Sequence, residues 1–144
     1  MTARKCFTNT MEPPIFRPHI VAACASIPER EDALHIAVAT LYDQVDTLVV
    51  FLNGYGEKPG FLEDPKIVAL RSENEGIDPG DAGKFYHVQE FPDSYYLTFD
   101  DDLIYPHDYV ETLVSRIEMY SRECVVGFHG WDAIPNRSEE RRVG

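Results

Sequence analysis

Short, continuous apolar runs recur along this chain, and most of them end in a polar loop. Such runs predict β-strands, because they are too short for helices and rich in β-branched and aromatic residues. They lie at residues 19–25, 47–52, 67–70, 95–99 and 125–128. Apolar and polar positions do not alternate within them, which indicates burial on both faces, as in a parallel sheet.

Two stretches between these runs have the 3.6-residue period of amphipathic helices. One face of the first carries Leu34, Ala37, Val38 and Leu41, and one face of the second, at residues 108–120, carries Val110, Leu113, Val114 and Ile117. Ser26 and Glu29 have capping-box spacing before the first helix. We expect a third, short helix that begins near Ala82, is capped by Asp81 and runs through residues 84–89.

The elements follow one another as strand, helix, strand, strand, helix, strand, helix and strand. This order predicts an α/β fold, a three-layer α/β/α arrangement around a mostly parallel sheet. At 144 residues the chain is long enough for one domain, which we place at residues 19–132. Residues 1–18 are aperiodic and contain prolines, so we expect a flexible leader there, and a charged tail at residues 133–144.

Composition narrows the classes of function. Thirteen Lys and Arg residues against 25 Asp and Glu residues give a net charge of −12, which argues against binding of nucleic acid or of an anionic lipid surface. No apolar run approaches the roughly 18 residues of a transmembrane helix. The three cysteines have neither disulfide-framework nor metal-ligand spacing, which favours a reducing compartment and a cytoplasmic protein. An acidic protein that handles an anionic substrate needs a local cation.

Three consecutive aspartates, Asp100, Asp101 and Asp102, directly follow the run at residues 95–99, which we expect to be a central strand. Adjacent carboxylates repel one another, and a hard cation such as Mn²⁺ or Mg²⁺ removes this repulsion by taking oxygen ligands. If the strand pleat continues, Asp100 and Asp102 point to one side and Asp101 to the other. Because α/β sheets bind ligands at the carboxyl ends of strands, the position favours a metal site. The alternative is a solvated acidic turn with Asp108 as the cap of the next helix.

From about residue 19 to residue 130, the order of elements and motifs resembles the first half of a GT-A glycosyltransferase domain, most similar to family 2. The counterparts of its nucleotide-binding and metal-binding positions are Ala25, Ser26, Arg30, Asn53, Asp81, Lys84, Asp100, Asp101 and Asp102, followed by Pro106. The resemblance implies a nucleotide-sugar donor, with a UDP-sugar favoured, and a glycan or other hydroxyl acceptor. Asn53 departs from the family, which usually has an aspartate there to accept from the uracil imide, but asparagine can still pair with a base edge.

Sugar transfer suggests a role for each aspartate of this motif. The donor leaves as a diphosphate, and a divalent metal, Mn²⁺ or Mg²⁺, stabilises the charge that accumulates on its oxygens. We assign Asp102 to the metal, and Asp100 to the ribose or to a second metal contact. Asp101, on the other side of the predicted pleat, is placed with the nucleotide-binding residues without a defined partner.

Lys84 or Arg30 is expected to offset the charge that remains on the diphosphate. For Lys84 the alternative is a solvated lysine on the short helix, and for Arg30 it is a surface ion pair with Glu29 or Asp32. His129 is a further candidate metal ligand, since some GT-A enzymes use a late histidine. The alternative for His129 is a packed, hydrogen-bonded side chain.

An inverting transfer also needs a general base, and none is evident. The carboxylates after the last predicted strand are Asp132, Glu139 and Glu140, and none lies in a predicted element, so the chain resembles a truncated donor-binding half. Three functions stay open: a glycosyltransferase or a fragment of one, a non-catalytic nucleotide-sugar binding module or degenerate remnant, and a metal-dependent phosphohydrolase or nucleotidyltransferase. A half-domain would leave residues 125–128 as an apolar sheet edge, so we expect self-association or a partner chain there.

Overall fold

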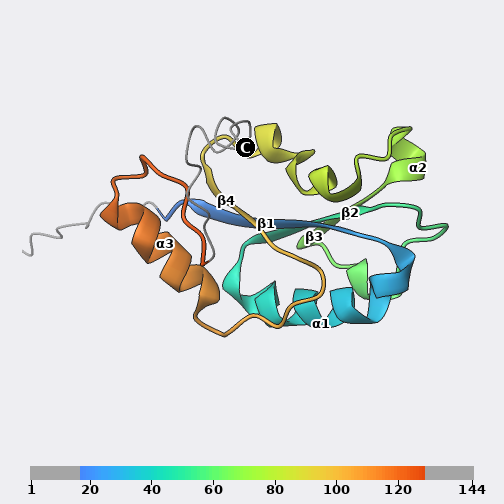
Figure 1. Ribbon diagram of the computed structural model, residues 1–144, viewed down its shortest axis with the longest axis horizontal. Coiled ribbons are helices and arrows are strands. Elements are labelled where there is room, and N and C mark those ends of the chain that lie inside the picture. Colours follow the sequence, from blue (N-terminus) through green and yellow to red (C-terminus); the bar gives the residue numbers. More distant parts are fainter. Residues whose placement is uncertain (1–16, 129–144) are drawn as a thin grey trace, which may run out of the picture.

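A four-stranded, all-parallel sheet forms the centre of the molecule in the computed structural model, which describes residues 17–128 (Figure 1). Its strands are β1 (His19–Ser26), β2 (Thr47–Leu52), β3 (Ile67–Arg71) and β4 (Ser94–Thr98), in the order β3-β2-β1-β4. The α-helices are α1 (Glu31–Leu41), α2 (Ser72–Glu75) and α3 (Tyr109–Met119), and the 3₁₀ turns are η1 (Pro28–Arg30), η2 (Tyr42–Gln44), η3 (Gly60–Leu62), η4 (Gly80–Phe85) and η5 (Val88–Glu90). The predicted α/β class and parallel sheet are confirmed. Apart from residues 17 and 18, the predicted leader lies outside the described residues, as does the predicted tail.

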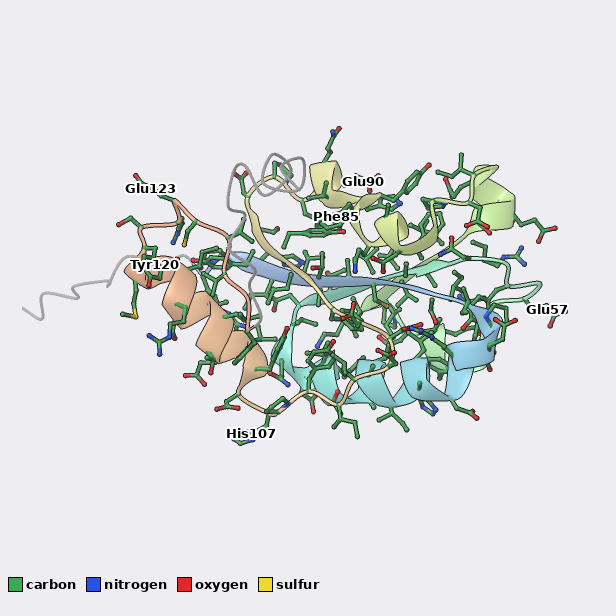
Figure 2. The ribbon with its side chains drawn as sticks, in the orientation of Figure 1. Glu57, Phe85, Glu90, His107, Tyr120 and Glu123 are labelled. Atoms are coloured by element: carbon green, nitrogen blue, oxygen red, sulfur yellow. The ribbon has the colours of Figure 1, made fainter. Side chains whose placement is uncertain are left out.

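Helices and 3₁₀ turns cover the two faces of this sheet as separate layers (Figure 1). On one face, α1 buries all four of its predicted apolar positions, Leu34, Ala37, Val38 and Leu41. On the opposite face lie η4 and η5, with Phe85 and Glu90 on the far side of the sheet from α1 (Figure 2). Phe51 of β2 packs into this second layer, where its ring meets the ring of Tyr86 with centroids 5.2 Å apart.

The position of β4 corrects one prediction. β1 and β2 are buried along nearly their whole length, as their continuous apolar runs indicated. β4 is only partly buried and lies at one edge of the sheet, so the expectation of a central strand was wrong. Residues 125–128 form no strand, which also removes the strand edge on which the expected interface depended. Val125 is fully exposed there, and Phe128 stacks on Tyr109.

The predicted capping box does not form. Ser26 is the last residue of β1, in register with Leu52 of β2, and its Oγ lies 3.5 Å from the carbonyl oxygen of Ile27. The side chain therefore belongs to the end of the sheet and caps no helix. The chain passes through η1 before α1 begins at Glu31.

The expected helix at residues 84–89 is replaced by the turns η4 and η5, and Asp81 caps neither. Gly83 of η4 is buried directly against Phe51, so that a Cβ built on Gly83 would lie 2.8 Å from Phe51 Cγ. The backbone rests on the sheet at this point. A residue without a side chain is required at position 83, and the chain forms 3₁₀ turns here in place of the expected helix.

The start of α3 is held by Gln44 of η2. Its Nε2 donates to the carbonyl oxygen of Pro106 at 2.7 Å, and its Oε1 accepts from the backbone N–H of Val110 at 3.1 Å. Asp108, directly before α3, makes no side-chain capping hydrogen bond. Of the four predicted apolar positions of α3, only Val110 is fully buried. Within the part of the chain that the structure describes, no helix is long and apolar enough to cross a membrane.

Tyr96 links β4 to η4 by a hydrogen bond, and its ionisation makes the stability of the fold decrease at alkaline pH. Its hydroxyl donates to the carbonyl oxygen of Lys84 at 2.8 Å, and burial raises the pKa of Tyr96 from 10.0 to about 12. Because the folded state holds this proton more tightly than the unfolded chain, the stabilisation is complete below pH 10.0 and is lost as the pH rises towards about 12. The unfolding free energy of the wild type should fall between pH 10 and about pH 12. In Tyr96→Phe this fall should be smaller by about 1–2 kcal/mol, measured by urea denaturation at each pH. Tyr120→Phe, at an exposed position, is the matched control, and equal profiles for the two variants would contradict the assignment.

Candidate functional site

The carboxyl ends of β1, β2 and β4 open into one cleft of about 350 Å³. It is lined by Ala25, Ser26, Ile27, Arg30, Asn53, Gly80, Asp81, Asp100, Asp101 and Asp102. Lys84 reaches the same cleft through ion pairs with Asp81 and Asp100. The structure therefore brings together all the candidate residues that the sequence placed before residue 129. His129, and the tail carboxylates Asp132, Glu139 and Glu140, lie outside the described residues.

The three consecutive aspartates form a turn and do not continue β4. The strand ends at Thr98, so the pleat that would have put Asp100 and Asp102 on one side does not reach them. Asp101 and Asp102 instead share Arg30, whose Nη1 lies 2.9 Å from Asp101 Oδ1 and 3.3 Å from Asp102 Oδ2. The predicted alternation is wrong, and Asp101 lines the cleft with its neighbours.

The two carboxylates that Arg30 contacts differ in their exposure to solvent. The side chain of Asp101 is only 4% exposed, whereas that of Asp102 is 48% exposed. Hydrogen bonding and attraction to Asp101, followed by attraction to Asp102, raise the pKa of Arg30. The alternative surface pair of Arg30 with Glu29 or Asp32 is not among the ion pairs of residues 17–128. Arg30 is thus a cation of the cleft and not of the outer surface of α1.

Lys84, in η4, supplies the second cation. Its Nζ lies 3.0 Å from Asp81 Oδ2 and 3.4 Å from Asp100 Oδ1, and its side chain is 14% exposed. Burial opposes the charge, but hydrogen bonding and attraction to Asp81, together with attraction to Asp100, outweigh it and raise the pKa of Lys84. Lys84 is therefore a largely buried, charged group, which excludes the alternative of a solvated helix lysine.

Tyr105 fixes the shape of the acidic turn, and the sequence did not single it out. Its buried hydroxyl accepts from the backbone N–H of Asp100 at 2.8 Å and donates to the carbonyl oxygen of Asp100 at 3.1 Å. Burial raises the pKa of Tyr105, although its hydrogen bond to the Asp100 backbone acts in the other direction, so the hydroxyl stays a donor at neutral pH. In sequence, Tyr105 resembles any other core aromatic, because its role depends on how the turn folds back.

Asn53 carries an unpaired acceptor in the wall of the cleft. The residue is 5% exposed, and its Nδ2 donates to the carbonyl oxygen of Gly80 at 2.9 Å. That bond orients the amide and leaves Oδ1 buried with no hydrogen-bond partner among the described residues. A buried acceptor without a partner is unfavourable, so a ligand N–H that reached Oδ1 would be bound favourably.

Tyr55 is the second residue that the sequence did not identify. Its hydroxyl donates to the carbonyl oxygen of Ile27 at 2.9 Å and lies 3.4 Å from Ser26 Oγ. Burial raises the pKa of Tyr55, so this donor too is retained at neutral pH. Tyr55 fixes the loop between β1 and η1, and thereby the position from which Arg30 enters the cleft.

The side-chain oxygens of the cleft suit a hard divalent cation only when a bound phosphate compound supplies further oxygen ligands. Four carboxylates and two cations, Asp81, Asp100, Asp101, Asp102, Arg30 and Lys84, give a formal charge of −2. Among residues 17–128 no three His, Cys, Asp or Glu side chains lie close enough together to hold a metal by themselves. Mg²⁺ commonly binds through one or two carboxylates together with substrate phosphates, so the residues fit a metal that a phosphate helps to coordinate.

A second cavity, of about 420 Å³, lies between β4, α3 and residues 122–127, and its lining is mostly apolar and includes no carboxylate. In the part of the chain that the structure describes, this second cavity therefore lacks the carboxylates that line the cleft. The sequence matches no protein-family model, and a search of curated proteins returns no significant match.

Proposed function

We propose that the cleft binds a nucleoside-diphosphate sugar together with Mn²⁺ or Mg²⁺, and that the chain is the donor-binding part of a GT-A type glycosyltransferase. The observation that carries the proposal is the convergence in one cleft of a buried unpaired acceptor, two cations and a group of carboxylates. A nucleotide sugar needs all three, for its base, its diphosphate and its metal. The cleft lies at the carboxyl edge of a parallel sheet, where such folds bind ligands.

Asn53 is suited to the base. Its free Oδ1 accepts an N–H, which both uracil and guanine present, so the amide supports recognition of either base. The oxygen is covered, so a base reaches it only after a small local shift of the groups that surround Asn53. Ala25, which lacks a bulky side chain, leaves room for a flat ring beside the end of β1.

The two cations are suited to the diphosphate. Arg30 and Lys84 enter from different elements, η1 and η4, and contact different aspartates of the acidic turn. A bound Mn²⁺ or Mg²⁺ would add Lewis-acid stabilisation of the diphosphate as the leaving group. Asp102 is one of the two exposed carboxylates of the turn, with Asp100, and we assign it the metal contact, with Asp100 as a second metal ligand or a partner of the ribose. Asp101 is almost fully buried and orients Arg30.

A binding module without turnover is the second candidate, and one observation favours it. Each of the four cleft carboxylates is within ion-pair distance of Arg30 or Lys84. A carboxylate engaged in this way is a poor base for the hydroxyl of an acceptor. The described part of the cleft thus has the groups for donor binding but no free carboxylate for proton removal.

Calorimetric titration of the full chain with UDP and with GDP, each in Mn²⁺ and in EDTA, tests the proposal. We expect at least one nucleotide to bind at least about 10-fold more tightly in Mn²⁺, because the metal offsets the negative charge of both cleft and diphosphate. Inorganic pyrophosphate is the control for the base. It should bind more weakly than the nucleotide, because it cannot reach Asn53.

The outcomes separate the candidates. Failure of both nucleotides to bind in Mn²⁺ would overturn the proposed function, and equal binding of pyrophosphate would overturn the role of Asn53. Incubation of the chain with a radiolabelled nucleotide sugar then distinguishes an enzyme from a binding module. Release of nucleoside diphosphate indicates turnover, whereas retention of intact donor indicates binding alone.

A further inference from the structure

Arg30 contacts two carboxylates of the cleft, and both contacts involve a single nitrogen atom of its guanidinium group. Its Nη1 contacts both Asp101 and Asp102, and its Nε and Nη2 groups donate to no other side chain or backbone group among residues 17–128. A guanidinium has five N–H donors in a planar fork that matches phosphate oxygens. Most of the hydrogen-bonding capacity of Arg30 is therefore available to a ligand.

The two contacts of Arg30 differ in how readily they break. The contact with Asp101 is 2.9 Å long and involves a carboxylate that is almost fully buried, so its loss would leave a buried charge unpaired. The contact with Asp102 is 3.3 Å long, longer than a typical charge-assisted hydrogen bond, and both side chains are about half exposed. Solvent-exposed pairs of this kind contribute little to stability. Arg30 can thus leave Asp102 at small cost while it stays on Asp101.

We propose that Arg30 is an exchangeable counter-cation, which neutralises Asp102 until ligand binds and then turns its free N–H groups to the diphosphate of the nucleotide. The inference rests on the proposed function, since it requires a diphosphate in the cleft. It extends that function by making the binding of metal and nucleotide mutually dependent. Metal alone must compete with Arg30 for Asp102, and nucleotide alone meets a cleft with a formal charge of −2.

The unpaired Oδ1 of Asn53 supports a ligand in this position independently of the carboxylates. Asn53 lines the same cleft as Arg30 and Asp102 but directly follows β2, which pairs with β1, the strand that leads into η1. A nucleotide whose base reached Asn53 would lie across the end of β1. Its diphosphate would then lie towards η1 and the acidic turn.

The test is a two-ligand titration of the wild-type chain and of Arg30→Gln. Free Mn²⁺ is followed by electron paramagnetic resonance without nucleotide, and nucleotide binding is followed by calorimetry with and without Mn²⁺. In Arg30→Gln we expect Mn²⁺ alone to bind about 5- to 10-fold more tightly, because the competing cation has gone. Nucleotide in saturating Mn²⁺ should bind about 10-fold more weakly, because the guanidinium contact is lost. A purely structural role for Arg30 would not change these two affinities in opposite directions.

Two further variants make the result interpretable. Arg30→Lys retains a positive charge near Asp101 and covers the case in which Arg30→Gln does not fold. It should leave Mn²⁺ affinity within about twofold of wild type while it weakens nucleotide binding, because it lacks the fork. Arg116→Gln, on the exposed side of α3, is the matched control and should change neither affinity.

Each failure points to a different conclusion. Unchanged or weaker Mn²⁺ binding by Arg30→Gln, with normal nucleotide binding by wild type, overturns the exchange and leaves the proposed function intact. Failure of the wild-type chain to bind any nucleotide overturns the proposed function and the exchange together. Opposite changes in the two affinities, absent from Arg116→Gln, support the exchange.

Discussion

Asp102→Asn is expected to weaken nucleotide binding in Mn²⁺ by about 100-fold and not to weaken nucleotide binding in EDTA, where the loss of one negative charge and the release of Arg30 favour the diphosphate. Asparagine keeps the shape of the side chain but removes the charge that a hard divalent cation requires. Asp102 is about half exposed, so the substitution leaves no buried group unpaired and should not affect folding. The measurement is calorimetric titration with the tighter of UDP and GDP, beside the melting temperature of each variant.

Asp108→Asn provides the matched control for that experiment. It makes the same chemical change six residues along the chain, at an exposed aspartate whose side chain forms no cap on α3. Its nucleotide affinity in Mn²⁺ should equal that of the wild type. If Asp102→Asn bound as tightly as Asp108→Asn, Asp102 would not hold the metal, and its assignment would be wrong.

Gly83→Ala is expected to lower the unfolding free energy by about 2–3 kcal/mol. The new Cβ would lie 2.8 to 2.9 Å from Cγ, Cβ and Cδ1 of Phe51, closer than such carbon atoms can approach. Phe51 is fully buried and cannot turn away, so the overlap must be relieved by lifting η4 off the sheet. Urea denaturation monitored by circular dichroism measures the loss.

The same displacement should reach the cleft, because η4 carries Gly80, Asp81 and Lys84. We therefore expect the folded fraction of Gly83→Ala to bind nucleotide more weakly than wild type. Gly60→Ala is the control, since a Cβ built there meets nothing within 4 Å and the backbone needs no positive φ. Its unfolding free energy should stay within about 0.5 kcal/mol of wild type, and an equally small change in Gly83→Ala would contradict the packing argument.

Much of the fold follows directly from the order of apolar and polar residues. Continuous apolar runs predicted β1 and β2 nearly to the residue, because a strand buried on both faces needs apolar side chains at every position. The helical period predicted the buried face of α1 for the same kind of reason. Predictions from neighbouring residues failed at two places. Ser26 was predicted to cap a helix but is the last residue of β1. The predicted helix around Gly83 does not form, and Gly83 lies directly against Phe51 of the sheet.

The sequence by itself determined which residues surround the cleft, because the carboxyl ends of parallel strands meet at one edge and Ser26, Asn53 and the acidic motif each follow a strand. Only the tertiary structure decided how these residues pair. Among the described residues, Arg30 forms ion pairs with Asp101 and Asp102 and not with its chain neighbours Glu29 and Asp32, and the hydroxyl of Tyr105 hydrogen-bonds to the backbone of Asp100. These pairings depend on distances between elements far apart in the chain, and a one-dimensional pattern carries the type and order of side chains but not those distances.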